Sequence, residues 1–237
     1  YSMVQPRLNS DVNSIGVINL LEAIRENNPD ISFVHVGTTT QLGHMHYKPA
    51  DEFHPEFPTD IYSANKTVAE KYVLLYAKAY GIKGSVIRLP NTYGPRAAIH
   101  SPDFTFNNYF IGLALQNKKL TVYKPGNQLR NILYVEDAVR ALFTAAKSNK
   151  SHGETFFAVS NQHFTVNEIA EKTCEFLGGS VDLINWPVER KAIEIGDAIL
   201  SNNKIKNTLG WNSKVDFEEG LLKTRTYFYN CLDKYIK

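Results

Sequence analysis

The chain has 237 residues and a hydrophobic content of 43%, enough to fill the core of one large domain or two small ones. Charged residues make up 21% of the sequence and nearly cancel to a formal net charge of +2, which disfavours nucleic acid and anionic membranes as partners. The two cysteines fit neither a zinc site nor a disulfide framework, and no apolar run approaches the ~20 residues that cross a bilayer, so we expect a soluble, cytoplasmic protein that binds a small ligand.

The first part of the chain alternates between helical and strand patterns. Apolar residues recur at helical spacing over residues 11–27, and a β-branched segment over 31–36 ends at Gly37 and three threonines. A Pro-rich loop over 48–60 precedes a predicted helix over 63–80, which ends at Gly81, and a strand follows over 84–89. This order predicts a parallel sheet covered by helices.

The pattern is less regular beyond the turn-rich run at 90–96. It predicts helices near 109–116, 135–148, 166–177 and 217–229, and strands near 120–123, 155–160 and 181–187. The sequence has no internal repeat and no low-complexity linker. Any second domain is therefore expected to be interwoven with the first.

Tyr62 and Lys66 form the first chemical feature of interest. Tyr62 directly precedes the helix predicted over 63–80, and Lys66 lies in its first turn. Because the two residues are four positions apart, we expect them on one face of this helix. A fixed cation beside a phenol favours the phenolate and lowers the phenol pKa from its ordinary value near ~10, so Tyr62 would exchange a proton with a substrate hydroxyl. With 13 Tyr and 26 Lys and Arg, about one such pair is expected by chance, so its position in the chain carries the argument.

Five ordered segments resemble the extended short-chain dehydrogenase/reductases, the NAD-dependent epimerase/dehydratase family that includes UDP-galactose 4-epimerase. A strand ends in Thr38, the Tyr-x-x-x-Lys pair follows at 62–66, and a second strand leads into Arg-Leu-Pro-Asn-Thr-Tyr-Gly-Pro at 88–95. Three further segments resemble the family: Asn-Ser-Ile-Gly-Val-Ile-Asn-Leu-Leu-Glu-Ala at 13–23, Gln-Leu-Arg-Asn-Ile-Leu-Tyr-Val-Glu-Asp at 128–137, and Lys-Ile-Lys-Asn-Thr-Leu-Gly-Trp at 204–211. The resemblance therefore covers nearly the whole chain.

The resemblance implies a role for each matching residue. Tyr62 is expected to be the acid/base, Lys66 to orient the nicotinamide ribose, and Thr38 to bond the reacting sugar hydroxyl. The cofactor would be NAD, with NADP left open, and the substrate a nucleotide-diphosphate sugar. The expected cofactor-binding set is Asn13, Thr38, Tyr62, Lys66 and Pro90, and the expected substrate-binding set is Thr38, Asn91, Arg130 and Arg190. No metal site is expected.

The resemblance also implies an α/β fold. We expect a Rossmann-like parallel sheet with helices on both faces, formed by residues 1–96 and 131–160, and a smaller interwoven α+β substrate domain, formed by 97–130 and 161–237. The family's Gly-rich loop for the dinucleotide pyrophosphate is not in this sequence, so roughly eighty to ninety residues of the first half are expected to be missing from it. As it stands, the chain should bind NAD weakly and leave an exposed parallel edge on its sheet.

Two threonines separate the functional alternatives. The family's dehydratases carry Asp-Glu directly after the catalytic threonine, whereas this chain has Thr39 and Thr40, which favours epimerisation through a transient keto sugar over elimination. A dehydratase or reductase of a related sugar nucleotide is the second hypothesis, and a non-catalytic dinucleotide-binding sensor is the third. Leu42 stands where many family members have Tyr.

The remaining candidates have plain structural interpretations. His44 and His46 are two residues apart without an acidic or Cys ligand at suitable spacing, which favours a solvated loop. Arg190 lies in a charged run that fits a solvated cluster equally well. A stripe at helical spacing is typical of a packing surface, and in this family it also fits a homodimer; its members are Tyr72, Tyr76 and Tyr80.

Overall fold

The computed structural model describes residues 2–191 and 194–236, without the side chains of residues 189 and 190. The chain divides into two compact units that alternate along the sequence. Unit 1 comprises Tyr1–Pro90, Ala138–Val159 and Leu200–Asn212, and unit 2 comprises Asn91–Asp137, Ser160–Ile199 and Ser213–Lys237.

These boundaries differ from the predicted ones in four places, one of which is the single residue Ser160, assigned to unit 2. Residues 91–96 and 131–137 belong to unit 2, because β3 (Asn91–Tyr93) pairs with β5 (Leu129–Tyr134). Residues 200–212 belong to unit 1, because they contain α8 (Asn203–Leu209), which packs against β6 (Thr155–Phe157). The assignment of one part to the cofactor and the other to the substrate stays a prediction.

A parallel sheet forms the centre of unit 1. Its strands are β1 (Phe33–Thr38), β2 (Gly84–Leu89) and β6, in the order β1-β2-β6, and the register pairs Thr38 with Leu89. The predicted α/β class and parallel sheet are thus confirmed. Within the described part of the chain, β1 pairs only with β2, and Val36 on it is exposed, so β1 is an edge strand.

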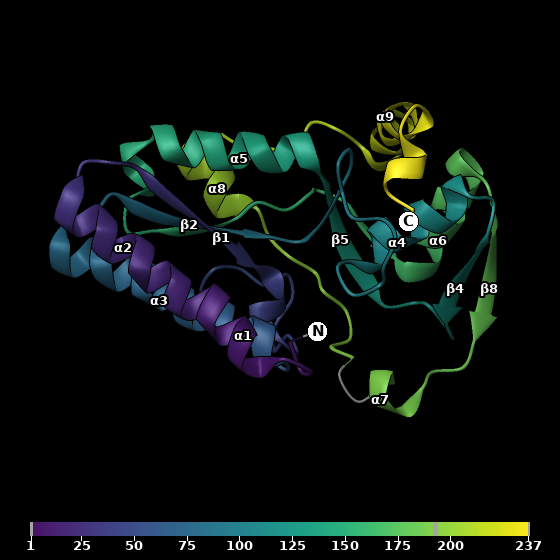
Figure 1. Cartoon of the computed structure of the whole chain (residues 1–237), viewed down its shortest axis with the longest axis horizontal. Helices are drawn as coiled ribbons and strands as arrows, with labels where there is room; N and C mark the ends of the chain where they lie inside the picture. The colour runs from purple at the N-terminus through teal and green to yellow at the C-terminus, as the bar shows by residue number, and fades with distance from the viewer. Residues whose placement is uncertain (1, 192–193, 237) are drawn as a thin grey trace. The chain divides into compact units, whose positions relative to one another are not determined.

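Helices cover both faces of this sheet (Figure 1). On one face lie α2 (Gly16–Asn27) and α3 (Ile61–Tyr80), side by side, and on the other lie α5 (Val135–Lys147) and α8. The helix predicted over 11–27 begins earlier, at α1 (Pro6–Ser10), and runs through a π-helical turn, Asp11–Ile15, into α2. Proline is tolerated in a first helical turn because its missing N–H needs no partner there.

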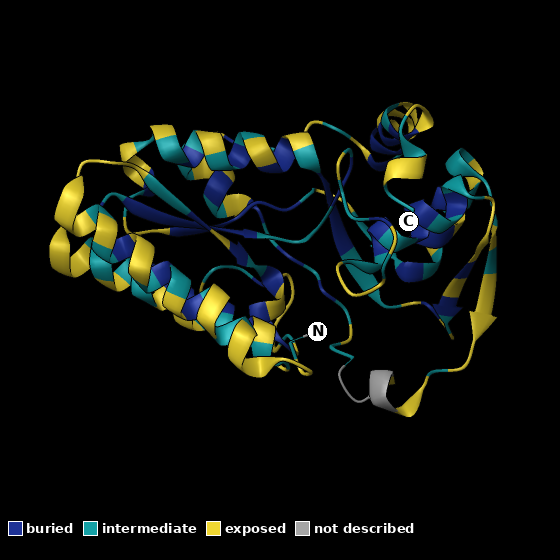
Figure 2. Cartoon of the chain, in the orientation of Figure 1, coloured by how far each residue is buried: buried dark blue, intermediate teal, exposed yellow. Residues whose placement is uncertain are grey.

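The inward faces of these elements are buried, as the dark blue residues in Figure 2 show, and the side chains of their central cluster are apolar. A valine or leucine side chain contributes roughly 1.5–3 kcal/mol on full burial. The cluster between α2, α3 and β2 consists of Val17, Leu21, Ala69, Val73 and Val86.

Unit 2 contains two small sheets and three longer helices among its described residues. One sheet has the order β3-β5-β7, with β7 (His163–Thr165) antiparallel to β5, and the other pairs β4 (Lys119–Tyr123) with β8 (Ser180–Ile184). The helices are α4 (Phe106–Leu115), α6 (Val166–Leu177) and α9 (Phe217–Tyr229), and α7 (Val188–Lys191) is one short turn. The sequence patterns do not predict β3, β5, β7, α7 or α8.

Two predicted strands are shorter in the structure. β6 ends at Phe157 rather than at residue 160, because its partner β2 ends at Leu89, one residue beyond the last paired position. β8 ends at Ile184, before the proline at 187, which cannot donate to a ladder. Of the helices that the structure describes, none has the length and apolar content to cross a membrane.

Candidate active site

Thr38 lies at the carboxyl end of β1, where parallel sheets commonly carry functional groups. The chain then turns through the 3₁₀ segment Thr39–Leu42 to Gly43, which has a φ of 59°. A Cβ atom at Gly43 would lie 1.9 Å from the Phe57 carbonyl oxygen, so only glycine fits this turn. The turn directs the three threonines back toward the start of α3.

A short chain of hydroxyl groups joins Thr38 to α3. The Oγ1 atoms of Thr38 and Thr40 share a hydrogen bond of 3.1 Å, and the buried Ser63 hydroxyl donates to Thr40 Oγ1 at 2.8 Å. The Ser63 backbone N–H donates to Asp60 Oδ1, which caps α3. The Thr38 hydroxyl is therefore two hydrogen bonds away from the residue that follows Tyr62.

Lys66 is buried in an unusual way for an ammonium group. Its residue exposure is 9%, and within the described residues it forms no hydrogen bond and no ion pair. Burial lowers the pKa of Lys66 to about 8, and the negative charge of Glu70 opposes this shift. A buried cation on the same helical face as Tyr62, with its donors free, fits the hydroxyl groups of a nucleotide ribose.

Tyr62 differs from the expectation drawn from the sequence. Its side chain is 38% exposed, and burial of the rest, followed by the charge of Asp60, raises the pKa of the phenol. Lys66 is not among the groups that shift it, so the expected lowering by this lysine is not found in the chain by itself. Desolvation disfavours the phenolate and so raises the pKa of Tyr62. A positive charge has to lie closer to the phenol than Lys66 does to lower this pKa again.

Asn65 connects the predicted cofactor residue Asn13 to this site. The Asn65 Oδ1 atom accepts a hydrogen bond from Ser14 at 3.2 Å, and its Nδ2 atom donates to Asn9 Oδ1 at 2.8 Å. Asn13 itself is half-buried in the π-helical turn and donates to the Asn9 carbonyl. The turn that carries Asn13 is thus fixed to the residue directly before Lys66.

The predicted cofactor residue Pro90 directly follows β2. Its neighbour Leu89 pairs with Thr38, so Pro90 lies at the same end of the sheet as the threonine turn. The cofactor roles of Asn13 and Pro90 stay predictions.

Three of the four predicted substrate residues, Asn91, Arg130 and Arg190, belong to unit 2, whereas Thr38 belongs to unit 1. Asn91 in β3 pairs with Ile132 in β5, and Arg130 lies two positions before Ile132, so Asn91 and Arg130 share one face of their sheet. The Arg130 guanidinium binds Glu194 at 2.5 Å and donates to the Gly196 carbonyl at 2.6 Å. A substrate diphosphate that binds Arg130, as predicted, would therefore compete with the Glu194 carboxylate for the guanidinium group.

Arg190 lies in α7, and its side chain is outside the described residues. Its predicted contact with the substrate stays a prediction.

One buried titratable residue near Lys66, His35, was not predicted from the sequence. His35 points inward from β1, is 6% exposed, and its Nε2 atom has no partner in the described part of the chain. Desolvation, and then the charge of Lys66, lower the pKa of His35 to about 4. The alternation of inward positions along β1 was the signal that could have indicated it.

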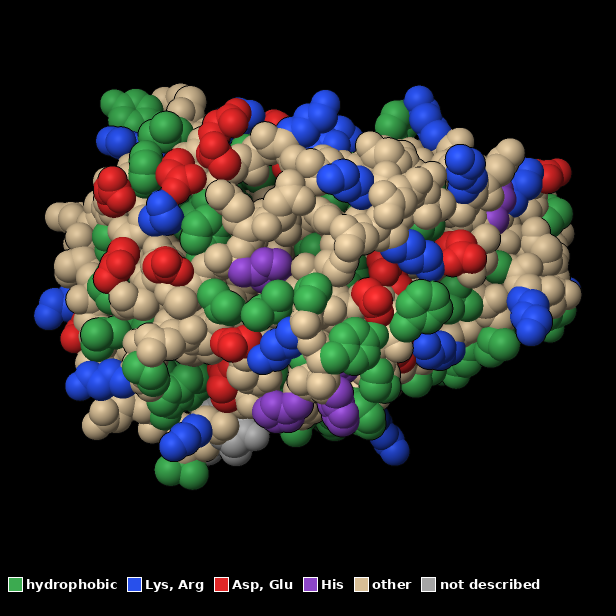
Figure 3. Space-filling view, turned by 180° about the vertical axis from the view of Figure 1, so that it is seen from behind, with side chains coloured by type: hydrophobic (Ala, Val, Ile, Leu, Met, Phe, Trp, Pro, Cys, Tyr) green, Lys and Arg blue, Asp and Glu red, His purple; other side chains and the backbone are tan. Residues whose placement is uncertain are grey.

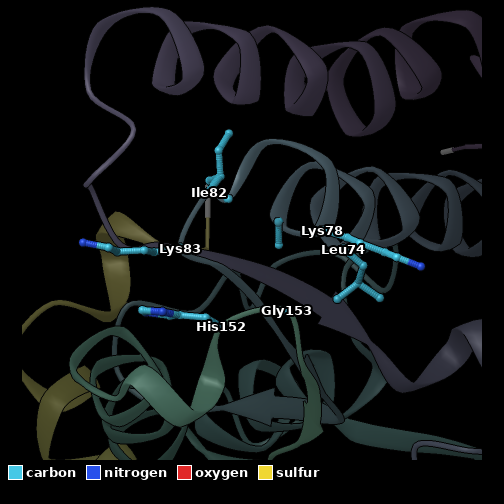
Figure 4. Close-up of a pocket in the computed structure, with 8 residues that line it drawn as sticks. Leu74, Lys78, Ile82, Lys83, His152 and Gly153 are labelled. Atoms are coloured by element: carbon cyan, nitrogen blue, oxygen red, sulfur yellow. The ribbon is translucent and has the colours of Figure 1, made fainter.

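Acidic and basic side chains are interspersed over the face drawn in Figure 3. A hollow lies at the amino end of β2, opposite the end that carries the Thr38 partner Leu89 (Figure 4). It is lined by Leu74, Ala77, Lys78, Gly81, Ile82, Lys83, His152 and Gly153. This is the end of a parallel sheet that ligands seldom use.

Comparison with known proteins gives the family. A sequence model described as GDP-mannose 4,6 dehydratase matches residues 1–224. The chain belongs to this family. The predicted membership of the NAD-dependent epimerase/dehydratase group of short-chain dehydrogenase/reductases is thereby confirmed.

Proteins named as epimerases and proteins named as dehydratases are both similar to this chain. A putative UDP-glucose 4-epimerase of Methanocaldococcus jannaschii is 29% identical over 231 residues, 97% of this chain and 73% of the relative. The chain spans 61% of the length of the bovine and human dTDP-D-glucose 4,6-dehydratases that it matches.

Solved structures of the same kind share the fold. The UDP-glucose 4-epimerase of Thermotoga maritima with UDP-glucose has a TM-score of 0.88 and 27% identity, over 98% of this chain and 74% of that one. The dTDP-glucose 4,6-dehydratase of Bacillus anthracis in complex with NAD has a TM-score of 0.81 and 27% identity, over 96% and 71%. Both structures support the Rossmann-like fold.

Proposed function

We propose that the full-length protein is an NAD-dependent nucleotide-sugar epimerase that acts through a transient keto sugar. The observation that carries the proposal is the hydroxyl chain from Thr38 through Thr40 to Ser63, next to Tyr62 and Lys66. It provides groups for exchanging a proton with a sugar hydroxyl, and it provides no acid at the positions that follow Thr38.

Each side chain has a distinct task in this proposal. The Tyr62 phenol exchanges the proton of the reacting sugar hydroxyl, and the Thr38 hydroxyl holds that oxygen in place. Lys66 donates to the hydroxyl groups of the nicotinamide ribose with its unpaired ammonium. NAD, when bound, supplies the acceptor and donor of the hydride.

The two residues after Thr38 favour epimerisation over dehydration. Eliminating water needs an acid that protonates the leaving hydroxyl, and the hydroxyls of Thr39 and Thr40 are too weak for this. The carboxylate of Asp60 accepts the Ser63 backbone N–H at 2.8 Å and caps α3. This task ties it to the helix terminus. The dehydratase and reductase alternatives remain outcomes of the test below.

Asn91 and Arg130 are the proposed contacts for the substrate diphosphate. They share a face of the β3-β5-β7 sheet, and an Arg fork with an amide suits two neighbouring phosphates. The similar Thermotoga maritima structure contains UDP-glucose, which supports a uridine or related nucleotide sugar as the substrate class.

A homodimer remains part of the proposal. Within the tyrosine stripe, Tyr76 donates to Glu22 at 2.6 Å and the Tyr80 ring lies under Arg25, so these two rings already contact α2. Exposed apolar side chains such as Val68 and Leu75 on α3 are the better candidates for a contact between subunits. Light scattering of the full-length protein checks this, and a monomer would contradict it.

The function is tested with the full-length protein and a panel of UDP-, GDP-, CDP- and dTDP-sugars, with NAD and NADP in separate reactions. We expect NMR to show an epimerised product for at least one sugar. Tyr62→Phe should abolish conversion while NAD binding is retained. A dehydrated or reduced product would replace the proposal with one of its alternatives, and NAD binding without turnover of any sugar would favour the sensor hypothesis.

A further inference from the structure

A buried polar network lies beneath the threonine turn, outside the groups assigned above. Its members Gln41, Glu70 and Arg88 are each at most 1% exposed. They come from the 3₁₀ segment after β1, from α3 and from β2. Buried charges are costly unless they are paired and fully hydrogen-bonded, so a network of this kind needs a reason to be there.

Gln41 connects this network to Thr38. Its Oε1 atom accepts the backbone N–H of Thr38 at 3.0 Å, and its Nε2 atom donates to Glu70 Oε2 at 3.0 Å. Each polar end of one amide side chain is thus engaged, one by the reacting threonine and one by a carboxylate of α3. Gly37 leaves room for this link, because a Cβ atom there would lie 3.2 Å from Gln41 Oε1.

Glu70 is held from several sides. Arg88 donates to both of its oxygens, from Nε at 2.8 Å and from Nη2 at 2.7 Å, and Thr155 Oγ1 donates at 3.0 Å. The same arginine also contacts Glu56, so its own charge is balanced. A bidentate arginine–carboxylate pair of this type fixes the orientation of the carboxylate as well as its position.

Glu70 also belongs to the helical face of Tyr62 and Lys66. The three residues follow one another at intervals of four in α3, so their side chains line one face over two turns. One carboxylate is therefore common to the helix that carries the acid/base pair and, through Gln41, to the turn that carries Thr38.

We propose that Gln41 and Glu70 are positioning residues, which fix the backbone of Thr38 relative to the helix of Tyr62 and Lys66. Neither side chain touches substrate in this proposal. Their effect is to hold the threonine hydroxyl at the distance from the phenol that proton exchange requires. The inference rests on the proposed function as far as the reaction rate is concerned, but the link itself is testable without any turnover.

The test compares two substitutions that each remove hydrogen bonds to the same carboxylate. Gln41→Met keeps the side-chain length and breaks the link to Thr38, whereas Thr155→Val keeps the shape and removes a donor to Glu70 while the bond between Gln41 and Thr38 stays in place. Both variants of the full-length protein should unfold at a slightly lower temperature than the native protein. Because both variants should lose a similar amount of stability, a difference between them in the two readouts below reports the link to Thr38.

The first readout is hydrogen exchange of the Thr38 amide, measured by NMR. Gln41→Met should accelerate this exchange by at least about tenfold, because the amide loses its acceptor, and Thr155→Val should leave it unchanged. Unaltered exchange in Gln41→Met, or equal acceleration in both variants, would overturn the inference.

The second readout is steady-state kinetics with the sugar found in the panel. Gln41→Met should lower kcat by about 10- to 100-fold with little change in KM or NAD affinity, as expected for misplacement of a reacting group. Thr155→Val should keep the native kcat. A native kcat in Gln41→Met would overturn the positioning role. A native protein that turns over no sugar would overturn the proposed function. In that case the hydrogen exchange of the Thr38 amide would still test the link between Gln41 and Thr38.

Discussion

The hydroxyl of Ser63 donates a hydrogen bond of 2.8 Å to Thr40, and Thr40 in turn bonds the hydroxyl of Thr38. Ser63 directly follows Tyr62, so the two parts of the candidate site are joined by side chains rather than by proximity alone. At the position of Thr40 this chain has a hydroxyl group, whereas the family's dehydratases are expected to carry a carboxyl group there.

Ser63→Ala tests this connection. Loss of the donor should leave Thr40 and Thr38 free to rotate, and the rate should fall about tenfold, which corresponds to the ~1.4 kcal/mol of one ordinary hydrogen bond. Ser151→Ala is the matched control, because Ser151 is equally buried but bonds only backbone carbonyls near α5. If both variants lose stability alike and keep the native kcat, the hydroxyl chain has no part in the reaction.

Lys66 sets the expected pH dependence at the alkaline side. Its pKa of about 8 lies below the ordinary value, so the ammonium is charged below pH 8 and becomes neutral as the pH rises through it. The titratable groups near it are Glu70, from the same helix, and His35, from β1, which is neutral at this pH because its pKa is about 4. We expect kcat/KM to decline above about pH 8, and Lys66→Arg to shift this decline upward because a guanidinium stays charged. An identical alkaline limb in both proteins would assign it to another group.

His35 should make the fold sensitive to acid. Its pKa is about 4 in the folded protein against 6.5 as the ordinary value, so the unfolded chain binds more protons between these two pH values. Stability is then fully present above pH 6.5 and falls as the pH drops toward 4, by up to roughly 3 kcal/mol from this residue. Urea unfolding at pH 7 and pH 4.5 should show a smaller difference for His35→Leu than for the native protein. His152→Gln is the control, and an equal pH effect in both variants would contradict the prediction.

Glu194 is expected to compete with the substrate for Arg130. Glu194→Gln weakens the internal pair and should tighten binding of a nucleoside diphosphate by about tenfold, since the guanidinium no longer has to exchange one charged partner for another. Calorimetric titration with UDP measures this. Glu154→Gln makes the same charge change at an exposed pair with Lys204 and should leave the affinity unaltered. Equal affinities in the two variants would exclude Arg130 from diphosphate binding.

Sequence patterns located the long elements well and the short ones poorly. α6 and α9 agree with the predicted bounds, because amphipathic spacing and capping residues such as Thr165 and Asp216 mark their ends. β3 and β7 are three residues each, too short for a periodicity to show. Their existence depends on pairing with β5, which is a long-range property of the chain.

The candidate site divides in the same way. Tyr62 and Lys66 could be paired from their spacing within one helix. The contacts of Gln41 with Glu70 and of Arg130 with Glu194 span 29 and 64 residues, and no local pattern indicates them. The raised pKa of Tyr62 was also beyond sequence reasoning, because it depends on how far the ring is desolvated.

The proposed epimerisation is tested most directly by running the reaction of the full-length protein in D₂O and following the sugar by NMR. A hydride that leaves a sugar carbon and returns to it never exchanges with solvent, so we expect an inverted carbon that carries hydrogen and no deuterium. Deuterium at the inverted carbon, or a product that has lost water, would contradict it.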